Sequence, residues 1–418
     1  MRSTRPPLPV GFRLQADPST CTSDDGQVLD GGSPWRMLRL TWRGADLAAA
    51  LLDGAAVAGD VDGALARRLV DAGLAHPLPP VAPSPSMTVV VPVRDRAAEL
   101  DACLTALGSL STVVVDDASR DSAAVAGVAA RHGARLVSRT TNGGPAAARN
   151  TGVGDVDTDL VAFVDSDCLA SASALRALAR HFGDPVVAAA APRVLPARGD
   201  GRSSSAAGRS PLDMGELPAA VAPGSRVGYV PSTALVVRRQ VLVALGGFDE
   251  SLRYGEDVDL CWRLHDAGWS LRYDPRVGVR HVEPEGWPAL ARRFHYGTSA
   301  GPLARRHPGA LRGPSLRGIT APVALAGAHS AGELSLPPEV LRRVVRTAPT
   351  ATVAGLLRWG TPLWWPPLAA VGTHPRHAAS AVVDEAAYGA GVWWSCLRSR
   401  TLEPVLPVIS ARRPTSSP

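Results

Sequence analysis

Four short apolar runs, each followed by a stretch that suits a helix, dominate the middle of this chain. The runs are apolar throughout rather than alternating, which is typical of strands buried on both faces of a parallel sheet. Right-handed crossovers bring the carboxyl ends of such strands to one edge, where these sheets bind their ligands. We therefore expect a nucleotide-binding α/β domain. The predicted strands span 87–93, 112–117, 134–138 and 160–165, and the predicted helices span 96–107, 120–132, 145–152 and 171–182.

The region before this repeat has a different character. Residues 77–86 hold five prolines in ten positions, and proline excludes both a helix interior and a central strand, so a stiff linker is predicted there. The preceding residues, 1–76, contain a predicted strand (36–42) and two predicted helices (44–54 and 61–73). They suit a small winged-helix-like module, and a structural cap on the next domain is the alternative.

After residue 183 the regularity loosens, although the domain is expected to continue from 87 to 300. The residues from 196 to 226 are rich in Gly, Pro, Ser and Arg and are interpreted as a mobile loop near the site. The remaining predicted elements are a strand pair within 227–239, a helix over 256–268, and short strands over 269–275 and 277–281.

The last stretch, 301–418, has no clear period but holds five of the ten tryptophans. Its most apolar piece, 351–372, contains Arg358 and three prolines, which makes a poor membrane span. Two interpretations stay open: a helical cap on the catalytic domain, or an amphipathic surface that rests on the inner face of a membrane.

Charge and cysteine usage narrow the class of protein. The net charge is +6, all 44 basic residues are Arg, and no Arg run approaches a nucleic-acid-binding tail. The five cysteines form no CxxC pair, which argues against a disulfide scaffold or a zinc knuckle. The first residues lack the apolar core of a signal peptide, so a cytoplasmic enzyme or adaptor is expected.

Two carboxylates follow the fourth apolar run, at Asp165 and Asp167, with Ser166 between them. At the ligand edge of the sheet, such a pair can hold a ribose hydroxyl and a divalent cation, Mg²⁺ or Mn²⁺, that bridges a diphosphate. The Asp-x-Asp spelling occurs five times in the chain, and this copy is distinguished by its place after a predicted strand.

Other strand ends carry candidate nucleotide contacts. Asp117 ends the second run and can accept a hydrogen bond from a base or ribose, although capping the next helix is an alternative that Ser119 could also serve. Pro92, in the first run, can shape a wall against the base. Arg149 lies one turn into the helix after the Gly-rich turn at 141–145 and could reach a phosphate.

A second acidic pair, Glu256 and Asp257, opens the helix predicted over 256–268. Asp257 shares the apolar face of that helix, where a carboxylate is costly unless it has a partner or a purpose, and it could act as a general base. Complementing the helix dipole is the plainer interpretation. His281 follows a short strand and could complete a metal site with Asp167, although a lone histidine there is more often structural.

These motifs together resemble the inverting family-2 glycosyltransferases with the GT-A fold, in that family's order and spacing over about 87–300. The segments are VVVPVRDR (89–96), VVVDDASRD (113–121), NGGPAAARNTG (142–152), FVDSDC (163–168) and GGFDESLRYGEDVDLCWRLHDAGW (246–269). The resemblance implies a single displacement with a UDP-sugar donor and a divalent metal. One departure concerns base recognition, because Val93 and Arg94 replace the family's usual aromatic residue and Asn after the proline.

The resemblance also implies roles for individual residues. Asp117 would contact the uracil side of the donor, Asp165 the sugar-nucleotide and Asp167 the metal, with His281 as a possible further ligand. Asp257 would deprotonate the acceptor hydroxyl.

The N-terminal region is similar to that of a member of this family that acts on a peptide-derived redox cofactor, and to small modules that recognise precursor peptides. That likeness implies transfer of a hexose, glucose from UDP-glucose, to a small-molecule or peptide-derived acceptor. A transferase for cell-wall or lipid-linked saccharides and a non-enzymatic peptide-binding adaptor remain alternatives. A nicotinamide dehydrogenase would also suit the strand–helix repeat, but the glycine fingerprint is missing.

Overall fold

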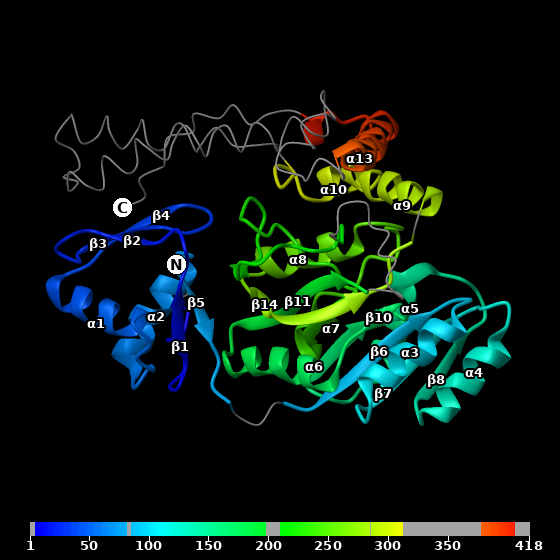
Figure 1. Ribbon diagram of the computed structural model, residues 1–418, viewed down its shortest axis with the longest axis horizontal. Coiled ribbons are helices and arrows are strands. Elements are labelled where there is room, and N and C mark those ends of the chain that lie inside the picture. Colours follow the sequence, from blue (N-terminus) through cyan, green and yellow to red (C-terminus); the bar gives the residue numbers. More distant parts are fainter. Residues whose placement is uncertain (1–4, 82–84, 198–209, 285, 312–377, 406–418) are drawn as a thin grey trace. The chain divides into compact units, whose positions relative to one another are not determined.

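The computed structural model describes residues 5–81, 85–197, 210–284, 286–311 and 378–405 (Figure 1). They fall into two compact units, Met1–Glu285 and Gly286–Pro418. Within the described ranges, no helix combines the length and apolar character needed to cross a membrane. The apolar piece 351–372, and with it the prediction about its membrane contact, lies outside the described residues.

A nine-stranded mixed sheet forms the core of the first unit. The four predicted apolar runs are neighbouring parallel strands in the order β9-β6-β7-β8. Every residue of β9 is buried, as expected for a strand covered on both faces. The bounds are β6 (Met87–Val93), β7 (Thr112–Asp117), β8 (Arg135–Arg139) and β9 (Leu160–Val164).

The predicted helices lie between these strands. The chain moves one way along the sheet from β6 to β8 and then returns to β9 on the other side of β6. Because such crossovers are right-handed, α3 and α4 cover one face and α5 covers the other. The strand order reverses between β6 and β9, and sheets of this kind have their ligand crevice at the carboxyl ends of the strands where the order reverses. The helices are α3 (Ala97–Leu107), α4 (Ser122–Arg131), α5 (Gly144–Val153) and α6 (Ala172–Ala179), the last followed by a 3₁₀ turn, η1 (Arg180–Gly183).

The second half of the sheet differs in detail from the prediction. Within residues 227–239 there is one strand, β13, rather than a pair, and the two short strands expected between 269 and 281 are one long strand with a register shift, β14. A further strand, β11, was not predicted, because its run of alanines and its two prolines hide the apolar pattern. The bounds are β10 (Cys168–Leu169), β11 (Val187–Pro196), β12 (Ala219–Ala220), β13 (Ala234–Arg238) and β14 (Ser270–His281), with helices α7 (Arg239–Ala244) and α8 (Glu256–Asp266). The prediction of an α/β fold is confirmed.

Residues 5–78 build a small module with its own core. Leucines from two helices and a strand, among them Leu14, Leu51 and Leu69, pack together with almost no exposed surface. The first two residues of the predicted linker, Pro77 and Leu78, belong to a strand, where they pair with Leu14 and Arg13. The elements are β1 (Arg13–Ala16), β2 (Cys21–Thr22), β3 (Val28–Gly31), β4 (Arg36–Arg39), α1 (Trp42–Leu52), α2 (Asp60–Asp71) and β5 (Ala75–Leu78).

The second unit is helical where it is described. Its α9 and α13 pack so closely that a Cβ on Gly391 would collide with the carbonyl oxygen of Phe294. Glycine therefore sets the distance between these two helices. The elements are α9 (Trp287–Gly297), α10 (Ala300–Arg306), α13 (Ala378–Ser399) and a 3₁₀ turn, η4 (Glu403–Val405).

Candidate active site

The acidic turn after β9 lies at the crevice edge of the sheet. The Asp165 amide donates to the carbonyl of Thr233 (3.0 Å), and the Cys168 amide donates to the carbonyl of Asp165 (2.9 Å). Ser166 is buried within this turn, and Pro92 is half-buried near the end of the neighbouring strand β6. The turn is thus fixed to the fold through its backbone, which leaves its two carboxylates to meet other groups.

Arg149 connects this turn to the start of α8. Its Nη2 donates to Asp165 Oδ1 (2.7 Å) and its Nη1 donates to Glu256 Oε1 (2.9 Å). The Arg149 side chain is only 3% exposed. Burial alone would lower its pKa, but the charges of Asp165 and Glu256 outweigh that effect and raise the pKa above its usual value. Arg149 is therefore a permanent cation held between two carboxylates, while its predicted contact with a phosphate stays a prediction.

Asp257 follows Glu256 at the start of α8 and lies beside this bridge. Gly255 adopts a left-handed conformation (φ 81°) immediately before α8, which a residue with a side chain rarely tolerates. Burial, and next the charge of Glu256, raise the pKa of Asp257 to about 7. The Val258 amide donates to Asp257 Oδ1 (2.8 Å). This carboxyl group can accept a proton near neutral pH, as a general base must.

A second group of charges surrounds Asp167. Its Oδ1 lies 3.3 Å from His281 Nε2, and its Oδ2 pairs with Arg96. His281 Nδ1 in turn lies 3.1 Å from Glu283 Oε1. Burial would raise the pKa of Asp167, but His281 and Arg96 bring it down to about 2. Burial would lower the pKa of His281, but Asp167 and Glu283 raise it to about 9.

Asp167 and His281 together suit a divalent cation that also binds oxygen atoms of a substrate. In the part of the chain that is described, no three His, Cys, Asp or Glu side chains are grouped so that they could hold a metal by themselves. Mg²⁺ in nucleotide-dependent enzymes commonly takes one or two protein ligands and fills its shell with phosphate oxygens and water. Asp167 Oδ1 and His281 Nε2 face each other, and a cation that binds Nε2 would displace its proton, since the raised pKa keeps His281 protonated at neutral pH. The Glu283 carboxylate would keep the other proton on Nδ1.

Asp117 lies apart from these groups, at the Gly-rich turn before α5. Its carboxylate accepts hydrogen bonds from the amides of Gly143 (2.9 Å) and Gly144 (2.8 Å) and from Arg139 Nε (2.9 Å). It is 4% exposed. In this arrangement Asp117 shapes the turn, and its predicted contact with a uracil stays a prediction.

The structure thus brings the predicted residues together in two groups. Arg149 bridges Asp165 and Glu256 with Asp257 beside them, and Asp167 faces His281. Three of the charged partners were not predicted from the sequence: Arg96, Arg139 and Glu283. A signal exists for each of them, since Arg96 and Arg139 lie at or just past the ends of strands β6 and β8, and Glu283 follows His281 by two residues.

The chain is similar to several known proteins. The chain is 44% identical over 317 residues to the pre-mycofactocin glycosyltransferase of Mycobacterium tuberculosis, which covers 74% of this chain and 66% of that protein. It is 39% identical over 102 residues to an N-acetylglucosaminyl-diphospho-decaprenol L-rhamnosyltransferase of the same organism, over 23% of this chain and 33% of that protein. The chain therefore spans just under two thirds of the length of the mycofactocin relative.

Among solved structures, a mannosyltransferase of Pyrobaculum calidifontis in complex with GDP-Man and Mn²⁺ is similar, with 18% identity and a TM-score of 0.47, over 77% of this chain and 89% of that one. The sequence pattern of the family described as "Glycosyltransferase like family 2" matches residues 83–295, which include both acidic groups. The prediction from the sequence is confirmed at this level: the chain belongs to glycosyltransferase-like family 2.

Proposed function

We propose that this protein transfers a hexose, glucose from UDP-glucose, to a hydroxyl group of pre-mycofactocin, with inversion at the anomeric carbon and with a divalent metal. The acceptor is suggested by the 44% identity to the pre-mycofactocin glycosyltransferase and by the N-terminal module that precedes the family match. The reaction type is supported by the charges that the fold brings together at the crevice edge.

One observation carries the proposal. Arg149 ties Asp165, at the donor edge of the sheet, to Glu256, and the pKa of the adjacent Asp257 is raised to about 7. A base with a pKa near 7 is about half ionised at neutral pH, and its ionised form binds a proton well enough to remove one from a hydroxyl group. The site therefore holds a suitable base within one ionic network of the strand-end motif.

The reaction follows from this arrangement. The acceptor oxygen forms a bond to the anomeric carbon while the bond from that carbon to the diphosphate oxygen breaks, and UDP leaves with the electron pair. The proton of the acceptor hydroxyl passes to the Asp257 carboxylate. Because one displacement suffices, no covalent glycosyl-enzyme and no second nucleophilic carboxylate are needed.

Asp167 and His281 would hold Mg²⁺ or Mn²⁺, which supplies positive charge to the diphosphate when it is bound. Arg96 pairs with Asp167 when no cation competes for this carboxylate. Arg149 holds the Asp165 and Glu256 carboxylates in place, so that the donor meets a fixed edge of the sheet.

The test is hexose transfer from UDP-glucose to pre-mycofactocin, followed by mass spectrometry. Asp257→Asn should lower the transfer rate by at least about 100-fold, because it removes the base, while UDP binding persists. Asp266→Asn, at the exposed far end of the same helix, is the matched control and should transfer at the wild-type rate. Equal loss of transfer and UDP binding in Asp257→Asn would show a structural role for that residue instead.

Two further measurements separate the alternatives. Asp167→Ala should abolish the gain in UDP affinity that Mg²⁺ or Mn²⁺ provides, and an unchanged gain would overturn the metal assignment. Hexose addition to a polyprenyl-diphosphate saccharide, but not to pre-mycofactocin, would favour the lipid-linked acceptor suggested by the rhamnosyltransferase relative. Tight binding of pre-mycofactocin with no transfer would favour an adaptor.

A further inference from the structure

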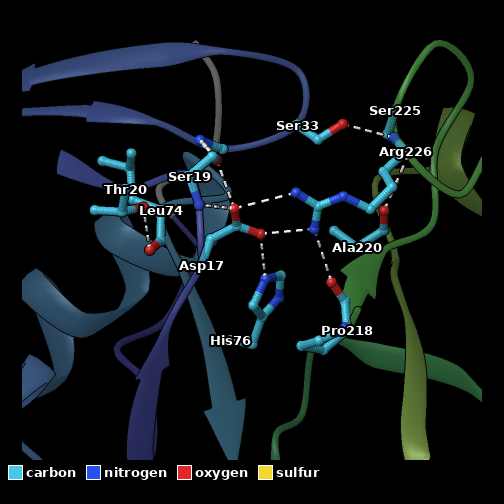
Figure 2. Close-up of polar contacts among 11 residues, drawn as sticks. Asp17, Ser19, Thr20, Ser33, Leu74, His76, Pro218, Ala220, Ser225 and Arg226 are labelled. Atoms are coloured by element: carbon cyan, nitrogen blue, oxygen red, sulfur yellow. Dashed lines mark hydrogen bonds and ion pairs between the residues drawn. The ribbon is translucent and has the colours of Figure 1, made fainter. Parts of the chain in front are cut away.

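A buried carboxylate of the N-terminal module holds an arginine of the transferase domain (Figure 2). Arg226 Nη1 donates to Asp17 Oδ2 (2.7 Å) and Nη2 donates to Asp17 Oδ1 (3.1 Å), so the pair is bidentate. His76 Nε2 lies 2.9 Å from the same carboxylate, and Ser19 donates to it through its amide and hydroxyl groups. Although burial raises the pKa of Asp17, His76 and Arg226 hold it well below its usual range, so this residue stays charged.

The module also fixes the backbone at Arg226. The Arg226 amide donates to Ser33 Oγ (2.6 Å), and Nη1 makes a further contact with the carbonyl of Pro218 (3.3 Å). The neighbouring Ser225 hydroxyl bonds to carbonyls on both sides of the turn, including that of Ala220 (3.2 Å). Arg226 is therefore held at its side chain and its main chain by residues separated from it by about half of the chain.

The segment that starts at Arg226 contacts α8. The Trp262 indole donates to the carbonyl of Gly228 (2.8 Å), and the Cys261 thiol lies 3.7 Å from the carbonyl of Val230. Both contacts come from the helix that opens with Glu256 and Asp257. The first residues of the segment thus set the position of α8 relative to the sheet.

The end of the same segment contacts both Asp165 and Asp257 of the proposed site. The carbonyl of Thr233 accepts the amide of Asp165 (3.0 Å), and the Ser232 backbone amide bonds to the Asp257 carboxyl group. Ser232 and Thr233 are buried. Six residues after the Arg226 contact with the module, the chain therefore touches the proposed base.

We propose that the Asp17–Arg226 pair makes the N-terminal module a positioning element of the active site: it holds segment 226–233 so that the Ser232 amide faces Asp257. This inference rests on the proposed function in assigning Asp257 as the base. The module then acts on transfer without contacting donor or acceptor through these residues. Releasing Arg226 frees the segment at the end that the module holds, and Asp257 loses a fixed hydrogen-bond donor.

The experiment compares Arg226→Met with Arg5→Met in the full chain. Arg5 is a matched control, since it is also a partly exposed arginine at the boundary between the module and the transferase domain: it pairs with Asp71 and donates to the carbonyl of Gly268, at the far end of α8. Amide hydrogen exchange should become about tenfold faster in peptides covering 226–233 and the first turns of α8 in Arg226→Met. Arg5→Met should leave these peptides within about twofold of wild type.

Transfer kinetics provide the second measurement. Arg226→Met should lower kcat with pre-mycofactocin and shift the acid limb of its pH profile to higher pH, because a lost amide donor raises the pKa of the base. UDP affinity should remain within about twofold, and Arg226→Lys should recover part of kcat because it keeps one ionic contact. Asp17→Asn should reproduce the exchange pattern of Arg226→Met.

The outcomes separate the two claims. Unchanged exchange in 226–233, or equal changes in Arg226→Met and Arg5→Met, would overturn the positioning role whatever the protein transfers. Faster exchange with unaltered kcat and pH profile would overturn its effect on catalysis. If the wild-type protein transferred no hexose to pre-mycofactocin, the proposed function would fail, while the exchange data would still decide whether the module holds the segment.

Discussion

Replacing Arg149 with methionine is expected to destabilise the protein and to alter its pH dependence together. The change removes two ion pairs, to Asp165 and Glu256, while it keeps a side chain of similar length. Removing one partner of a buried ion pair costs about 3–5 kcal/mol, because the other charge is left without compensation. Since the Asp165 side chain is 25% exposed, water can partly solvate it, and the lower end, about 3 kcal/mol, applies.

This loss should lower the melting temperature by about 6–12 °C. A double-mutant cycle with Glu256→Gln tests the cause. Neutralising Glu256 removes one of the stranded charges, so the double variant should regain about 1–2 kcal/mol relative to Arg149→Met alone. If the two single substitutions changed the free energy of unfolding by amounts that add up to the change in the double variant within about 0.5 kcal/mol, Arg149 and Glu256 would not interact. That result would refute the reasoning.

The pH profile gives an independent measure of the same change. Arg149 lowers the pKa of Asp257, so its removal should raise that pKa and move the acid limb of the transfer rate to higher pH. Arg149→Lys keeps the charge but loses the planar two-point geometry, and it should fall between the methionine variant and the wild type. An acid limb that does not move in Arg149→Met would contradict the electrostatic account.

Two other predictions use different observations. In the wild-type protein the transfer rate should fall as the pH drops through about 7, because Asp257 then binds a proton and can no longer act as a base; a rate independent of pH between about 6 and 8 would exclude Asp257 from that role. Gly152→Ala should destabilise the protein by about 1–3 kcal/mol in a denaturant titration, because its Cβ would collide with Val90 and come within 3.0 Å of a methyl group of Val115; a change below about 0.5 kcal/mol would show that α5 can shift away from the sheet.

The fold was most predictable where local pattern and burial agree. The strands β6, β7 and β9 are continuous apolar runs, and their burial on both faces is what such runs require. The strand β11 escaped prediction because alanine is not favoured in strands, and only its pairing with β13 and β14 makes that segment extended. Tertiary contacts, not local preference, decide the conformation there.

The candidate site shows the same division. Topology placed Asp165 and Asp167 at the crevice edge, because both follow a strand whose carboxyl end must lie there. Two other contacts could not be predicted, since the one between Arg149 and Glu256 spans 107 positions and the one between Arg226 and Asp17 spans 209. No periodicity in the sequence encodes contacts between residues so far apart.

Different partners give two aspartates of one crevice different chemistry. Asp167 faces His281 and Arg96, and its pKa falls to about 2, so it is ionised at every physiological pH, as a metal ligand must be. Asp257 is half-buried beside another carboxylate, and desolvation together with that charge raises its pKa to about 7. When the surroundings lower the pKa of one carboxyl group and raise that of another, the first stays charged and the second can take up and release a proton. The proposed division between metal ligand and base therefore follows from the neighbours of each carboxylate, and exchanging those neighbours should exchange the roles.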